Sequence, residues 1–346
     1  MSRGVVVLMA VVVMASWWGT ERVRRYALAR AILDVPNERS SHRVPTPRGG
    51  GLAIAAAVLG GIGAATVLGW VPVRFAAAAV GGGGAVAWVG WLDDRHRMSP
   101  WTRLAVQVGA GVWALAWTGA PDALTFGRAA LHLELAGPVL ALLWVVWLTN
   151  LFNFMDGIDG IAAAEAVAVG VIGGAMLLHG GQHSLALVAL ILAGGALGFL
   201  YWNWSPATIF MGDVGSGFLG FLFAILAVES ERSAAVPLWA WGMLLGAFVF
   251  DATLTLFRRI IGGEVWHAAH RSHAYQRAVT AGRSHAAVSA AALGLTTGLG
   301  LLAFVGMRSG APTAFLAIGV AALTAVYLVI ERWNPMRRSS GERAST

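Results

Sequence analysis

Long apolar blocks separated by short polar stretches run along almost the entire chain. The blocks are about 15–22 residues long, close to the roughly 20 apolar residues that a membrane-spanning helix needs. A soluble chain of 346 residues would show shorter periodic runs and more charge. The pattern therefore predicts an all-α, polytopic integral membrane protein with about eleven transmembrane helices. The expected helices cover residues 4–19, 50–70, 75–92, 101–119, 135–151, 160–179, 184–202, 212–228, 235–256, 285–306 and 311–330.

The arginines are divided unevenly between two sets of polar connections that alternate along the chain. Nineteen of the 24 basic residues, all of them Arg, lie in or beside one set. That set contains residues 21–48, 93–100, 152–159, 203–211, 257–284 and the end of the chain from residue 331. The other set has only Arg3, Arg74, Arg128, Arg232 and Arg308. Because cytoplasmic loops carry the excess of positive charge, we expect the N-terminus outside, the C-terminus in the cytoplasm and an odd number of spans.

The same pattern predicts the domain organisation. Residues 1–334 are expected to form one multi-pass membrane domain with active-site loops on its cytoplasmic side, followed by a polar cytoplasmic tail at residues 335–346. The first apolar block has the length of a signal-peptide core. The charged residues 21–25 would hold its flank inside, so we expect a retained anchor.

Composition narrows the chemistry that the protein can perform. The chain is 58% hydrophobic and 12% charged, and it contains no Cys and no Lys. Disulfides, thiolate metal sites, a Cys nucleophile, a Schiff base and a P-loop Lys are therefore excluded. The net charge of +7 gathers at the predicted cytoplasmic face, where anionic lipid and substrates account for it without nucleic acid. The glycine run at residues 81–84 lies inside a predicted helix and favours close helix packing over a phosphate loop.

The most unusual polar cluster follows the fifth apolar segment, at residues 150–160 (NLFNFMDGIDG). An Asp at the centre of a membrane helix costs about 2.5–3.5 kcal/mol. Asp156 and Asp159 beside hydrocarbon therefore indicate a bound cation, a proton relay or phosphate chemistry. If the helix continues, the i, i+3 spacing puts Asn153, Asp156 and Asp159 on one face. A capped helix junction would explain one of these Asp residues but not the whole set.

Two adjacent carboxylates, Asp93 and Asp94, close the third apolar segment. Adjacent carboxylates repel each other, and a divalent cation or an Arg offsets this repulsion. The alternative is simple pairing with Arg95 and Arg97. Residues 99–100 (SP) are typical of an N-cap followed by the first residue of a helix, so we expect the next helix to begin there.

Asp213 stands between glycines at the start of the eighth apolar segment, within residues 203–217 (NWSPATIFMGDVGSG). Its carboxylate is a hard oxygen ligand of the kind that Mg²⁺ or Mn²⁺ takes together with waters and substrate phosphates. The alternative is an Asp that only caps the helix. Asp251 lies inside the ninth segment, and the sequence leaves open whether it faces the site or pairs with Arg258.

Two basic segments are suited to phosphate groups. Residues 34–51 contain three prolines and three glycines, which forbid a helix over most of their length. Their guanidinium forks suit phosphate oxygens and belong to Arg39, Arg43 and Arg48. The second segment, residues 258–283, has the basic and aromatic mixture of an interfacial loop that holds an anionic head group. It contains His267, His270, Arg271 and His273. The alternatives are contact with lipid headgroups for the first segment and a zinc site for the second.

In this order, the five segments resemble the polyprenyl-phosphate N-acetylhexosamine-1-phosphate transferases, a family of membrane enzymes. The resemblance covers about residues 34–277, and its most specific parts are residues 153–160 (NFMDGIDG) and 210–216 (FMGDVGS). The family implies transfer of a sugar 1-phosphate from a UDP-sugar to undecaprenyl phosphate with release of UMP. It also implies a requirement for Mg²⁺, with Mn²⁺ as the alternative.

Carried over position by position, the resemblance implies a role for each candidate residue. The implied catalytic residues are Asp93, Asp94, Asp156 and Asp159. The implied metal ligands are Asp213 and Asn153. The implied substrate-binding residues are Asn203, Arg43, Arg48, Ser216, His270, Arg271 and His273. Among them, Asp93 matches the position nearest the acceptor phosphate, and Asn203 matches the nucleotide side.

Two segments separate the branches of this family. Residues 270–277 (HRSHAYQR) resemble the enzymes that initiate O-antigen or wall-polymer synthesis. Residues 45–50 (PTPRGG) differ from the pattern of the phospho-N-acetylmuramoyl-pentapeptide transferases, which are the alternative. The resemblance implies a UDP-N-acetylaminosugar donor, a bacterial inner-membrane location with the site on the cytoplasmic face, and a homodimer.

Outside this family, the alternatives are a membrane transporter and a lipid-phosphate phosphatase. A transporter would place polar groups near mid-membrane on broken helices. Only Asp251 and Glu165 come near that depth, so the distribution favours an active site on one face of the bilayer.

Overall fold

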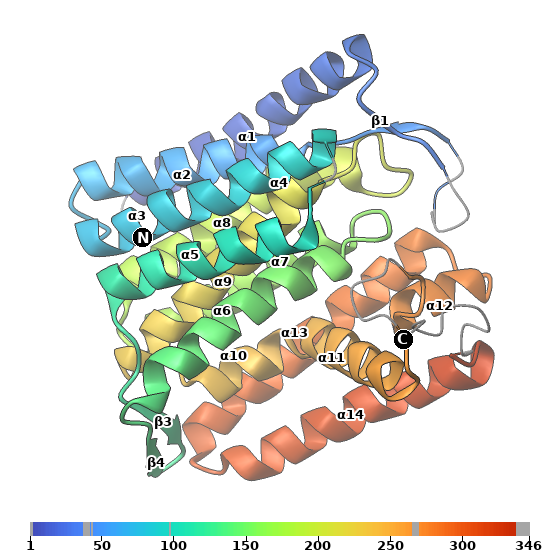
Figure 1. Ribbon diagram of the computed structural model, residues 1–346. Helices are drawn as coiled ribbons and strands as arrows, with labels where there is room; N and C mark the ends of the chain where they lie inside the picture. Colours follow the sequence, from blue (N-terminus) through green and yellow to red (C-terminus); the bar gives the residue numbers. More distant parts are fainter. Residues whose placement is uncertain (1–2, 37–41, 43, 97, 265–269, 337–346) are drawn as a thin grey trace.

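Long helices run along one common direction and form a bundle, with the connecting loops at its two ends (Figure 1). The computed structural model describes residues 3–36, 42, 44–96, 98–264 and 270–336. Its α-helices are α1 (Arg3–Ala29), α2 (Gly51–Val67), α3 (Val73–Ala78), α4 (Gly84–His96), α5 (Pro100–Thr118), α6 (Ala136–Phe154), α7 (Ile161–His179), α8 (His183–Asn203), α9 (Asp213–Arg232), α10 (Leu238–Leu244), α11 (Gly246–Ile261), α12 (Ala274–Thr280), α13 (His285–Ser309) and α14 (Pro312–Trp333). A short π-helix, η1 (Ala79–Gly83), joins α3 to α4. The strands form two antiparallel pairs, β1 (Leu33–Asp34) with β2 (Thr46–Pro47) and β3 (Ala123–Phe126) with β4 (Ala129–His132).

The described helices account for all eleven apolar segments, and the protein is a polytopic membrane protein. Eight of the described helices are long and apolar enough to cross a membrane. The number rises to nine if the bent pair α10–α11 is added as one further span. The third apolar segment is one of the eight, running through α3, η1 and α4. α2 is apolar but has only 17 residues, and α5, which carries Arg103 and Gln107, is not among the eight. The number of helices that cross the membrane stays a prediction.

The first helix is longer than the apolar pattern predicted. α1 continues to Ala29 instead of ending near residue 19. Arg24 and Arg25 each pair with Glu21 at 2.7 Å, at i, i+3 and i, i+4 spacing. Such pairs stabilise a helix beyond the point where its side chains cease to be apolar. The expected loop at residues 21–48 therefore begins as helix.

The fifth apolar helix ends inside the polar motif of residues 150–160. α6 stops at Phe154, and α7 begins directly after Gly160, whose φ of 77° lies in the left-handed region. The helix therefore does not continue through the motif, and Asn153, Asp156 and Asp159 do not share a helix face, because only Asn153 lies in the helix. Glycine adopts positive φ without steric cost, and this allows the chain to turn between α6 and α7.

The ninth apolar segment is also not a straight helix. α10 and α11 meet at an angle of 83°. Beyond the bend, the Asp251 carboxylate accepts hydrogen bonds from the backbone N–H groups of Ala274 (2.8 Å) and Tyr275 (3.2 Å). Asp251 thus caps α12, whereas Arg258 pairs with Glu331 at 2.9 Å.

The two ends of the bundle carry different structures. The hairpin β3–β4 lies at one end, whereas the β1–β2 pair, α12 and the loop before α9 gather at the other (Figure 1). The hairpin is attached to the end of α9 through Thr125, whose N–H and hydroxyl both donate to Glu231 Oε1, at 2.8 and 2.7 Å. α1 begins near the hairpin end and α14 finishes at the opposite end (Figure 1), as expected for an odd number of crossings. Which end faces the cytoplasm stays a prediction.

Helix α9 lies at the centre of the bundle and is buried from Val214 to Glu231. Neighbouring helices approach it through glycines. A Cβ at Gly82 would lie 2.5 Å from the Phe221 ring of α9, which confirms that the glycine run serves close packing. The buried helix holds Asp213, its first residue, in a fixed position at the loop-rich end.

Gly198 provides a test of the contact between α1 and α8. A Cβ at Gly198 would lie 2.4 Å from the carbonyl oxygen of Val13 and 2.8 Å from the backbone nitrogen of Trp17. Because backbone atoms cannot move aside as a flexible side chain does, we expect Gly198→Ala to lower stability by about 1–3 kcal/mol. The measurement is the thermal unfolding midpoint in detergent.

The matched control is Gly298→Ala in α13, where a Cβ would meet no atom within 4 Å. There, Ala should stabilise the helix by up to about 1 kcal/mol. An unfolding midpoint for Gly198→Ala equal to or above that of the wild type would contradict the close α1–α8 contact.

Candidate active site

The segment that carries Arg48 is fixed against the loop leading into α9. The Phe210 N–H donates to the carbonyl oxygen of Pro47 at 2.8 Å, and the Gly51 N–H donates to that of Met211 at 2.8 Å. A Cβ at Gly51 would lie only 2.2 Å from a backbone atom of α9, so glycine is needed for this approach. The pairing places the Arg48 side chain beside the start of α9.

Two guanidinium groups bridge three carboxylates at this end of the bundle. Arg48 Nε lies 2.7 Å from Asp94 Oδ1, and its Nη2 lies 2.7 Å from Asp213 Oδ1. Arg103 Nη1 lies 2.9 Å from Asp93 Oδ2 and 2.8 Å from Asp213 Oδ2. The three carboxylate side chains are between 3% and 13% exposed. These five residues are called the Asp–Arg cluster, which carries one excess negative charge when all its members are ionised.

Asp94 has a second task, which is to cap α9. Its Oδ1 accepts a hydrogen bond from the N–H of Asp213 (3.0 Å) and its Oδ2 from that of Val214 (3.3 Å). These are two of the N–H groups that a helix start leaves without an intrahelical partner. Gly212 permits the approach, because a Cβ there would lie 2.4 Å from Asp94 Oδ2. The side chain therefore holds both Arg48 and the start of α9.

Arg103 reaches the cluster from the first turn of α5. Ser99 is the N-cap, with its hydroxyl oxygen accepting from the Trp101 N–H at 3.3 Å, and Pro100 follows as the first helical residue. The predicted helix start is thus confirmed. Sequence reasoning missed Arg103 as a site residue. The sequence did contain an indication of its role. Arg103 is a single charge near the start of an apolar segment, and a charge in such a position needs a partner of opposite charge.

A small cavity of about 30 Å³ adjoins Asp213 between α4, α5, α6 and α9. Arg103, Asn153 and Asp213 line it, and the Asn153 side chain forms a hydrogen bond with Asp213. Beside them, Asn150 Nδ2 donates to Gln107 Oε1 at 2.6 Å. The two residues implied as metal ligands, Asn153 and Asp213, therefore lie side by side.

Asp156 lies on the α6–α7 loop, within electrostatic reach of the Asp–Arg cluster. Burial raises the pKa of its carboxyl well above the usual range, and Asp213 and Asp94 raise it further, although Arg48 acts in the opposite direction. A carboxyl in such a place can hold a proton at a higher pH than an ordinary Asp. The pKa of Asp156 thus depends on the charge of the cluster.

Asp159 instead joins three separate segments of the chain. Its Oδ1 lies 3.3 Å from His285 Nδ1 at the start of α13, and its Oδ2 accepts from the Ala207 N–H at 3.3 Å. The Ser289 hydroxyl donates to its backbone carbonyl at 2.7 Å. Burial alone would raise the pKa of Asp159, but the hydrogen bond and charge of His285 hold it below the usual value. Asp159 therefore ties the α6–α7 loop to α13 and to the loop before α9.

Asn203 and Ser216 use their side chains inside the fold. Asn203 Oδ1 accepts from the Gly160 N–H at 3.1 Å, and its Nδ2 donates to the Ile209 carbonyl at 3.0 Å. The Ser216 hydroxyl donates to the Gly212 carbonyl at 3.2 Å. Both residues are buried. Their contacts shape the loops around the site, and their direct contact with substrate stays a prediction.

His270 and His273, the two described histidines of the basic segment 258–283, lie next to each other, with His273 beside Asp251 of α11. His273 is buried, with Nδ1 3.5 Å from Asp251 Oδ1, and its ring stacks on Phe154 with centroids 6.4 Å apart. The His270 ring centroid lies 4.8 Å from that of His273. Burial, followed by the neighbouring His273, lowers the pKa of His270 to about 3. His270 is therefore neutral at physiological pH.

The remaining residues singled out in the sequence lie away from the Asp–Arg cluster or outside the described part of the chain. Arg271 is partly buried in the same loop. Arg95 does not pair with the adjacent aspartates; its Nη2 donates to the Tyr26 hydroxyl at 3.1 Å. The remaining predicted residues lie outside the described part of the chain, namely Arg39, Arg43, Arg97 and His267.

The fold and site define a polytopic membrane protein with carboxylates and guanidinium groups gathered at one end of its helices. The model of glycosyl transferase family 4 matches residues 76–231. A probable undecaprenyl-phosphate N-acetylglucosaminyl 1-phosphate transferase of Bacillus subtilis is 31% identical over 274 residues, covering 77% of this chain and 75% of that protein. The chain belongs to glycosyl transferase family 4 and is a membrane transferase.

Two further relatives show how the similarity is distributed. A decaprenyl-phosphate N-acetylglucosaminephosphotransferase of Mycobacterium tuberculosis is 28% identical over 303 residues, 78% of this chain and 74% of that protein. A phospho-N-acetylmuramoyl-pentapeptide-transferase of Moorella thermoacetica is 36% identical, but over only 154 residues, 44% of this chain and 46% of its own length. The similarity to the two polyprenyl-phosphate N-acetylglucosamine-phosphate transferases therefore extends over much more of the chain than the similarity to the muramoyl-pentapeptide transferase.

The Asp159–His285 pair predicts a pH-dependent contribution to stability. Because the folded-state pKa of Asp159 is lowered, its contribution is present above the unfolded value of about 3.9 and is lost as the pH falls through the folded pKa. We expect His285→Gln to unfold at a lower temperature than the wild type at pH 7. The difference should shrink as the pH falls below about 4, where the unfolded chain binds a proton at Asp159, and it should be lost once the pH is below the folded-state pKa.

The control is the same substitution in an Asp159→Asn background, where His285→Gln should have little effect at either pH. The measurement is the thermal unfolding midpoint of the four proteins in detergent. A difference at pH 7 that persists in the Asp159→Asn background would show that His285 acts through another partner.

Proposed function

We propose that the protein transfers an N-acetylaminosugar 1-phosphate from a UDP-sugar to undecaprenyl phosphate, giving a polyprenyl-diphospho-sugar and UMP. The Asp–Arg cluster carries the proposal, since it presents two guanidinium groups and three carboxylates at the loop-rich end of the bundle. Guanidinium forks bind phosphate oxygens, and carboxylates bind the cation that accompanies a diphosphate. The names of the Bacillus and Mycobacterium relatives support a polyprenyl phosphate acceptor and an N-acetylglucosamine donor.

The donor set at Asp213 fits Mg²⁺, with Mn²⁺ as the alternative. Within the described residues, no group of three or more His, Cys, Asp or Glu side chains is arranged to hold a metal ion. Mg²⁺ in phosphate-transfer sites needs fewer protein ligands, because one or two carboxylates, waters and substrate phosphates complete its shell. We propose that Asp213 and the adjacent Asn153 hold it. When bound there, the ion would neutralise charge on the diphosphate.

The Asp–Arg cluster would rearrange when substrates bind. Arg48 and Arg103 now occupy both carboxylate oxygens of Asp213. Phosphate groups would give these guanidinium groups new partners and release Asp213 for the cation. Because the cluster carries one excess negative charge, it would repel two anionic substrates, and a cation held at Asp213 would supply the positive charge that offsets this repulsion.

The chemistry requires one bond to form and one to break at the β-phosphorus of the UDP-sugar. An oxygen of the acceptor phosphate attacks in line, the bond to the oxygen bridging the two phosphorus atoms breaks, and UMP leaves with that oxygen. A phosphate monoester has a second pKa near 6, so the acceptor is mostly dianionic at neutral pH and needs positioning more than a strong base. Arg48 and Arg103 would position the phosphates, and Asp93 would take any remaining proton.

A covalent route through a phospho-Asp is the mechanistic alternative. Direct attack requires the acceptor, whereas the covalent route permits exchange between UDP-sugar and UMP in its absence. We favour direct attack because the carboxylates of Asp93 and Asp94 also accept backbone N–H groups, from Met98 and from Asp213 and Val214, which makes their oxygens poorer nucleophiles even after the arginines have moved to the phosphates.

The comparisons support our proposal for the donor, and the charge pattern supports our proposal for the membrane side. N-acetylglucosamine is the sugar we propose first, and the muramoyl-pentapeptide donor is the alternative, since relatives of that kind cover less of the chain. The concentration of arginines beside the loop-rich end supports placing the site on the cytoplasmic face of a bacterial inner membrane.

Acceptor-dependent release of UMP tests the proposed function. Purified protein is supplied with a panel of UDP-sugars, with or without undecaprenyl phosphate and Mg²⁺. We expect UMP only when a UDP-N-acetylaminosugar, the lipid phosphate and the cation are all present. Asp213→Asn should reduce the rate at least about a hundredfold, because it weakens the proposed metal ligand and leaves both arginines without their shared partner.

Asp122→Asn is the matched control, since Asp122 is exposed at the hairpin end. That variant should retain wild-type activity. If no UDP-sugar in the panel yields acceptor-dependent UMP, the proposed function is wrong. Hydrolysis of the lipid phosphate alone would instead identify a phosphatase.

A further inference from the structure

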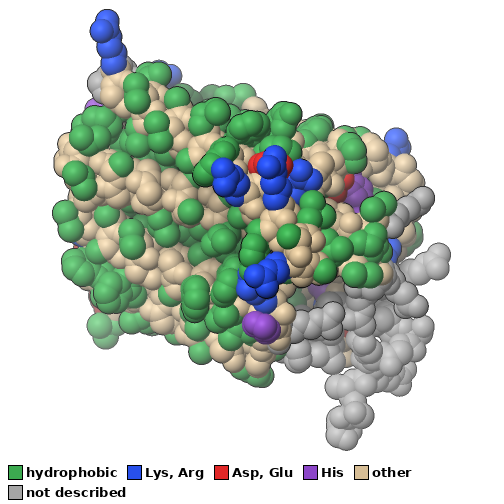
Figure 2. All heavy atoms as spheres, turned by 90° about the horizontal axis from the view of Figure 1, so that it is seen from above, with side chains coloured by type: hydrophobic (Ala, Val, Ile, Leu, Met, Phe, Trp, Pro, Cys, Tyr) green, Lys and Arg blue, Asp and Glu red, His purple; other side chains and the backbone are tan. Residues whose placement is uncertain are grey.

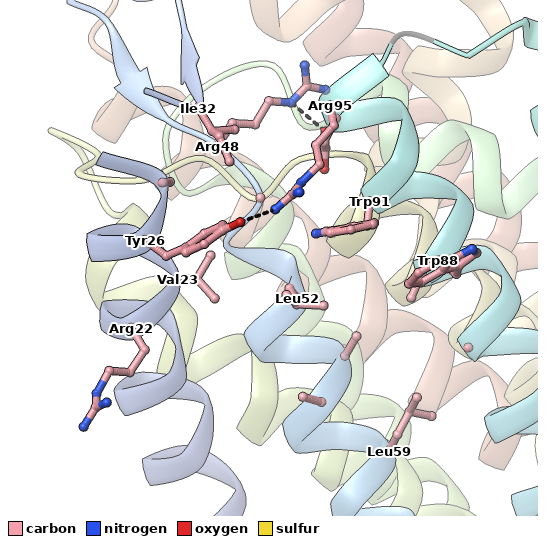
Figure 3. A pocket seen from close by; sticks show the side chains of 17 residues that line it. Arg22, Val23, Tyr26, Ile32, Arg48, Leu52, Leu59, Trp88, Trp91 and Arg95 are labelled. Carbon is pink, nitrogen blue, oxygen red and sulfur yellow. Dashed lines mark hydrogen bonds and ion pairs between the residues drawn. The ribbon is translucent and has the colours of Figure 1, made fainter. Parts of the chain in front are cut away.

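Two different structures border the candidate site. Between α1, α2 and α4 an open groove of about 640 Å³ leads to Arg48 and Asp94 (Figure 3). In Figure 2 the face that carries these three helices is covered largely by hydrophobic side chains, with a group of arginines among them. Away from this groove, α12 lies against the loop that joins α6 to α7. This short helix belongs to the basic segment 258–283 and supplies no member of the Asp–Arg cluster.

Two consecutive residues of α12 touch the loop of residues 155–160. The Tyr275 hydroxyl donates to the carbonyl oxygen of Phe154 at 2.9 Å, which satisfies one of the carbonyls that the end of α6 leaves without a partner. A Cβ at Gly157 would lie 2.2 Å from the Tyr275 hydroxyl oxygen and 3.0 Å from Gln276 Nε2. Both α12 side chains are buried. α12 therefore supports the loop that carries two of the carboxylates of the site.

The end of α14 is bonded to α12 and to the end of α11. Glu331 Oε2 lies 2.6 Å from Arg277 Nη1 of α12 and 2.9 Å from Arg258 Nη1 of α11. The backbone carbonyl of Asn334 accepts from Arg277 Nη1 at 2.9 Å, and its Nδ2 donates to the Arg277 carbonyl at 3.3 Å. Arg258 Nη1 also donates to the Tyr327 hydroxyl at 2.8 Å. Tyr327, Glu331 and Asn334 are called the α14 clamp.

Apolar packing alone does not hold α12 against α14. A cavity of about 560 Å³ lies between α11, α12, α13 and α14, and both Ala278 of α12 and Leu323 of α14 line it. The polar contacts of the clamp cross from one helix to the other beside this cavity. The Arg277 side chain is only 4% exposed, so its charge is removed from water and depends on Glu331 for compensation. The position of α12 therefore depends on the α14 clamp.

We propose that the α14 clamp acts through α12 to position the α6–α7 loop for the UDP-sugar. The inference rests on the proposed function and adds positioning residues from a helix that supplies no member of the Asp–Arg cluster. The connection runs from Glu331 through the Arg277 guanidinium to α12, and from the Tyr275 hydroxyl to the end of α6. Loss of the clamp would let α12 shift and would change the position of Asp156 relative to the cluster.

The loop between α6 and α7 is connected to the donor side of the site. Asn203, which the family resemblance places on the nucleotide side, accepts from the Gly160 N–H at 3.1 Å. Asp93, which the resemblance places nearest the acceptor phosphate, is held instead by Arg103 and by the Met98 N–H. These contacts of Asp93 do not involve α12. We therefore expect the clamp to affect binding of the UDP-sugar and to leave binding of the lipid phosphate unchanged.

The first test measures both KM values in the UMP-release assay. Glu331→Gln keeps the shape of the side chain but removes the charge that Arg258 and Arg277 share. We expect KM for the UDP-sugar to rise at least about fivefold and KM for undecaprenyl phosphate to stay within about twofold of the wild type. Tyr275→Phe removes only the hydroxyl that is bonded to Phe154, and it should raise the same KM.

Glu21→Gln is the matched control. Glu21 also pairs with two arginines, Arg24 and Arg25, but all three residues lie in α1, on the groove side of the bundle. This variant should have the KM values of the wild type for both substrates. Equal KM values for the UDP-sugar in Glu331→Gln and Glu21→Gln would overturn the proposal.

A double variant separates coupling through α12 from a general loss of stability. If Glu331 acts through Tyr275, Glu331→Gln should add little to the increase in KM that Tyr275→Phe causes. Fully multiplicative effects would overturn the proposed route through α12. Asn334→Ala removes only the hydrogen bond to the Arg277 carbonyl. It should raise KM for the UDP-sugar less than Glu331→Gln, and it provides the same comparison if Glu331→Gln does not fold.

The second test follows hydrogen–deuterium exchange of the full-length protein in detergent. Glu331→Gln should exchange faster than the wild type in residues 154–160 and 274–280, because both segments lose their support. Glu21→Gln should exchange like the wild type in both. Faster exchange confined to residues 274–280 would overturn the proposal, since α12 would then loosen without affecting the loop. This readout needs no substrate, so it decides the coupling even if absence of UMP release by the wild type refutes the proposed function.

Discussion

Asp213 binds two guanidinium groups at once, and the arrangement of the whole site depends on this interaction. Arg48 comes from the segment before α2, Arg103 from α5, and Asp94, the other partner of Arg48, from α4. Removing two opposite charges from water is costly unless the geometry is good and the remaining polar atoms are satisfied. The cluster meets that condition because Asp94 also accepts the first backbone N–H groups of α9. One network therefore fixes four segments, of which only α4 and α5 are neighbours in the chain.

Glycines make this convergence sterically feasible. A Cβ at Gly90 of α4 would lie 2.5 Å from the carbonyl oxygen of Asp213, and one at Gly51 of α2 would collide with the backbone of α9. Helices in a bilayer gain little hydrophobic free energy from packing on one another, so close contact between backbones contributes much of their association. Here the same close contact brings α2, α4 and α9 together at the ends that carry Arg48, Asp94 and Asp213. Packing and chemistry thus depend on the same small residues.

The two carboxylates of the NFMDGIDG motif, Asp156 and Asp159, have different surroundings in the fold. Asp156 lies near the cluster, whose charges help to raise its pKa, whereas Asp159 is engaged by His285 and by the backbone of the loop before α9. Their spacing of three residues suggested a common helix face, and the helix instead ends at Phe154. The spacing of two residues in the sequence fixes their relative position only when the secondary structure between them is known. Here the two glycines of the motif disfavour a helix. Asp159 is thereby a positioning residue for the loops, and Asp156 is the one that faces the charges of the cluster.

The order of residues along the chain was enough to predict the membrane class, the helical segments, the start of α5 at Ser99–Pro100 and the acidic residues of the candidate site. These features are local: apolar length, capping chemistry and unusual charges can all be recognised within a few adjacent residues. Three features became visible in the folded chain alone: Arg103 joins Asp93 to Asp213, Asp251 caps α12, and a groove between α1, α2 and α4 leads to the cluster. Each of these depends on contacts between segments distant in sequence. The apolar pattern shows which residues avoid water, but the packing of the helices determines which of them meet.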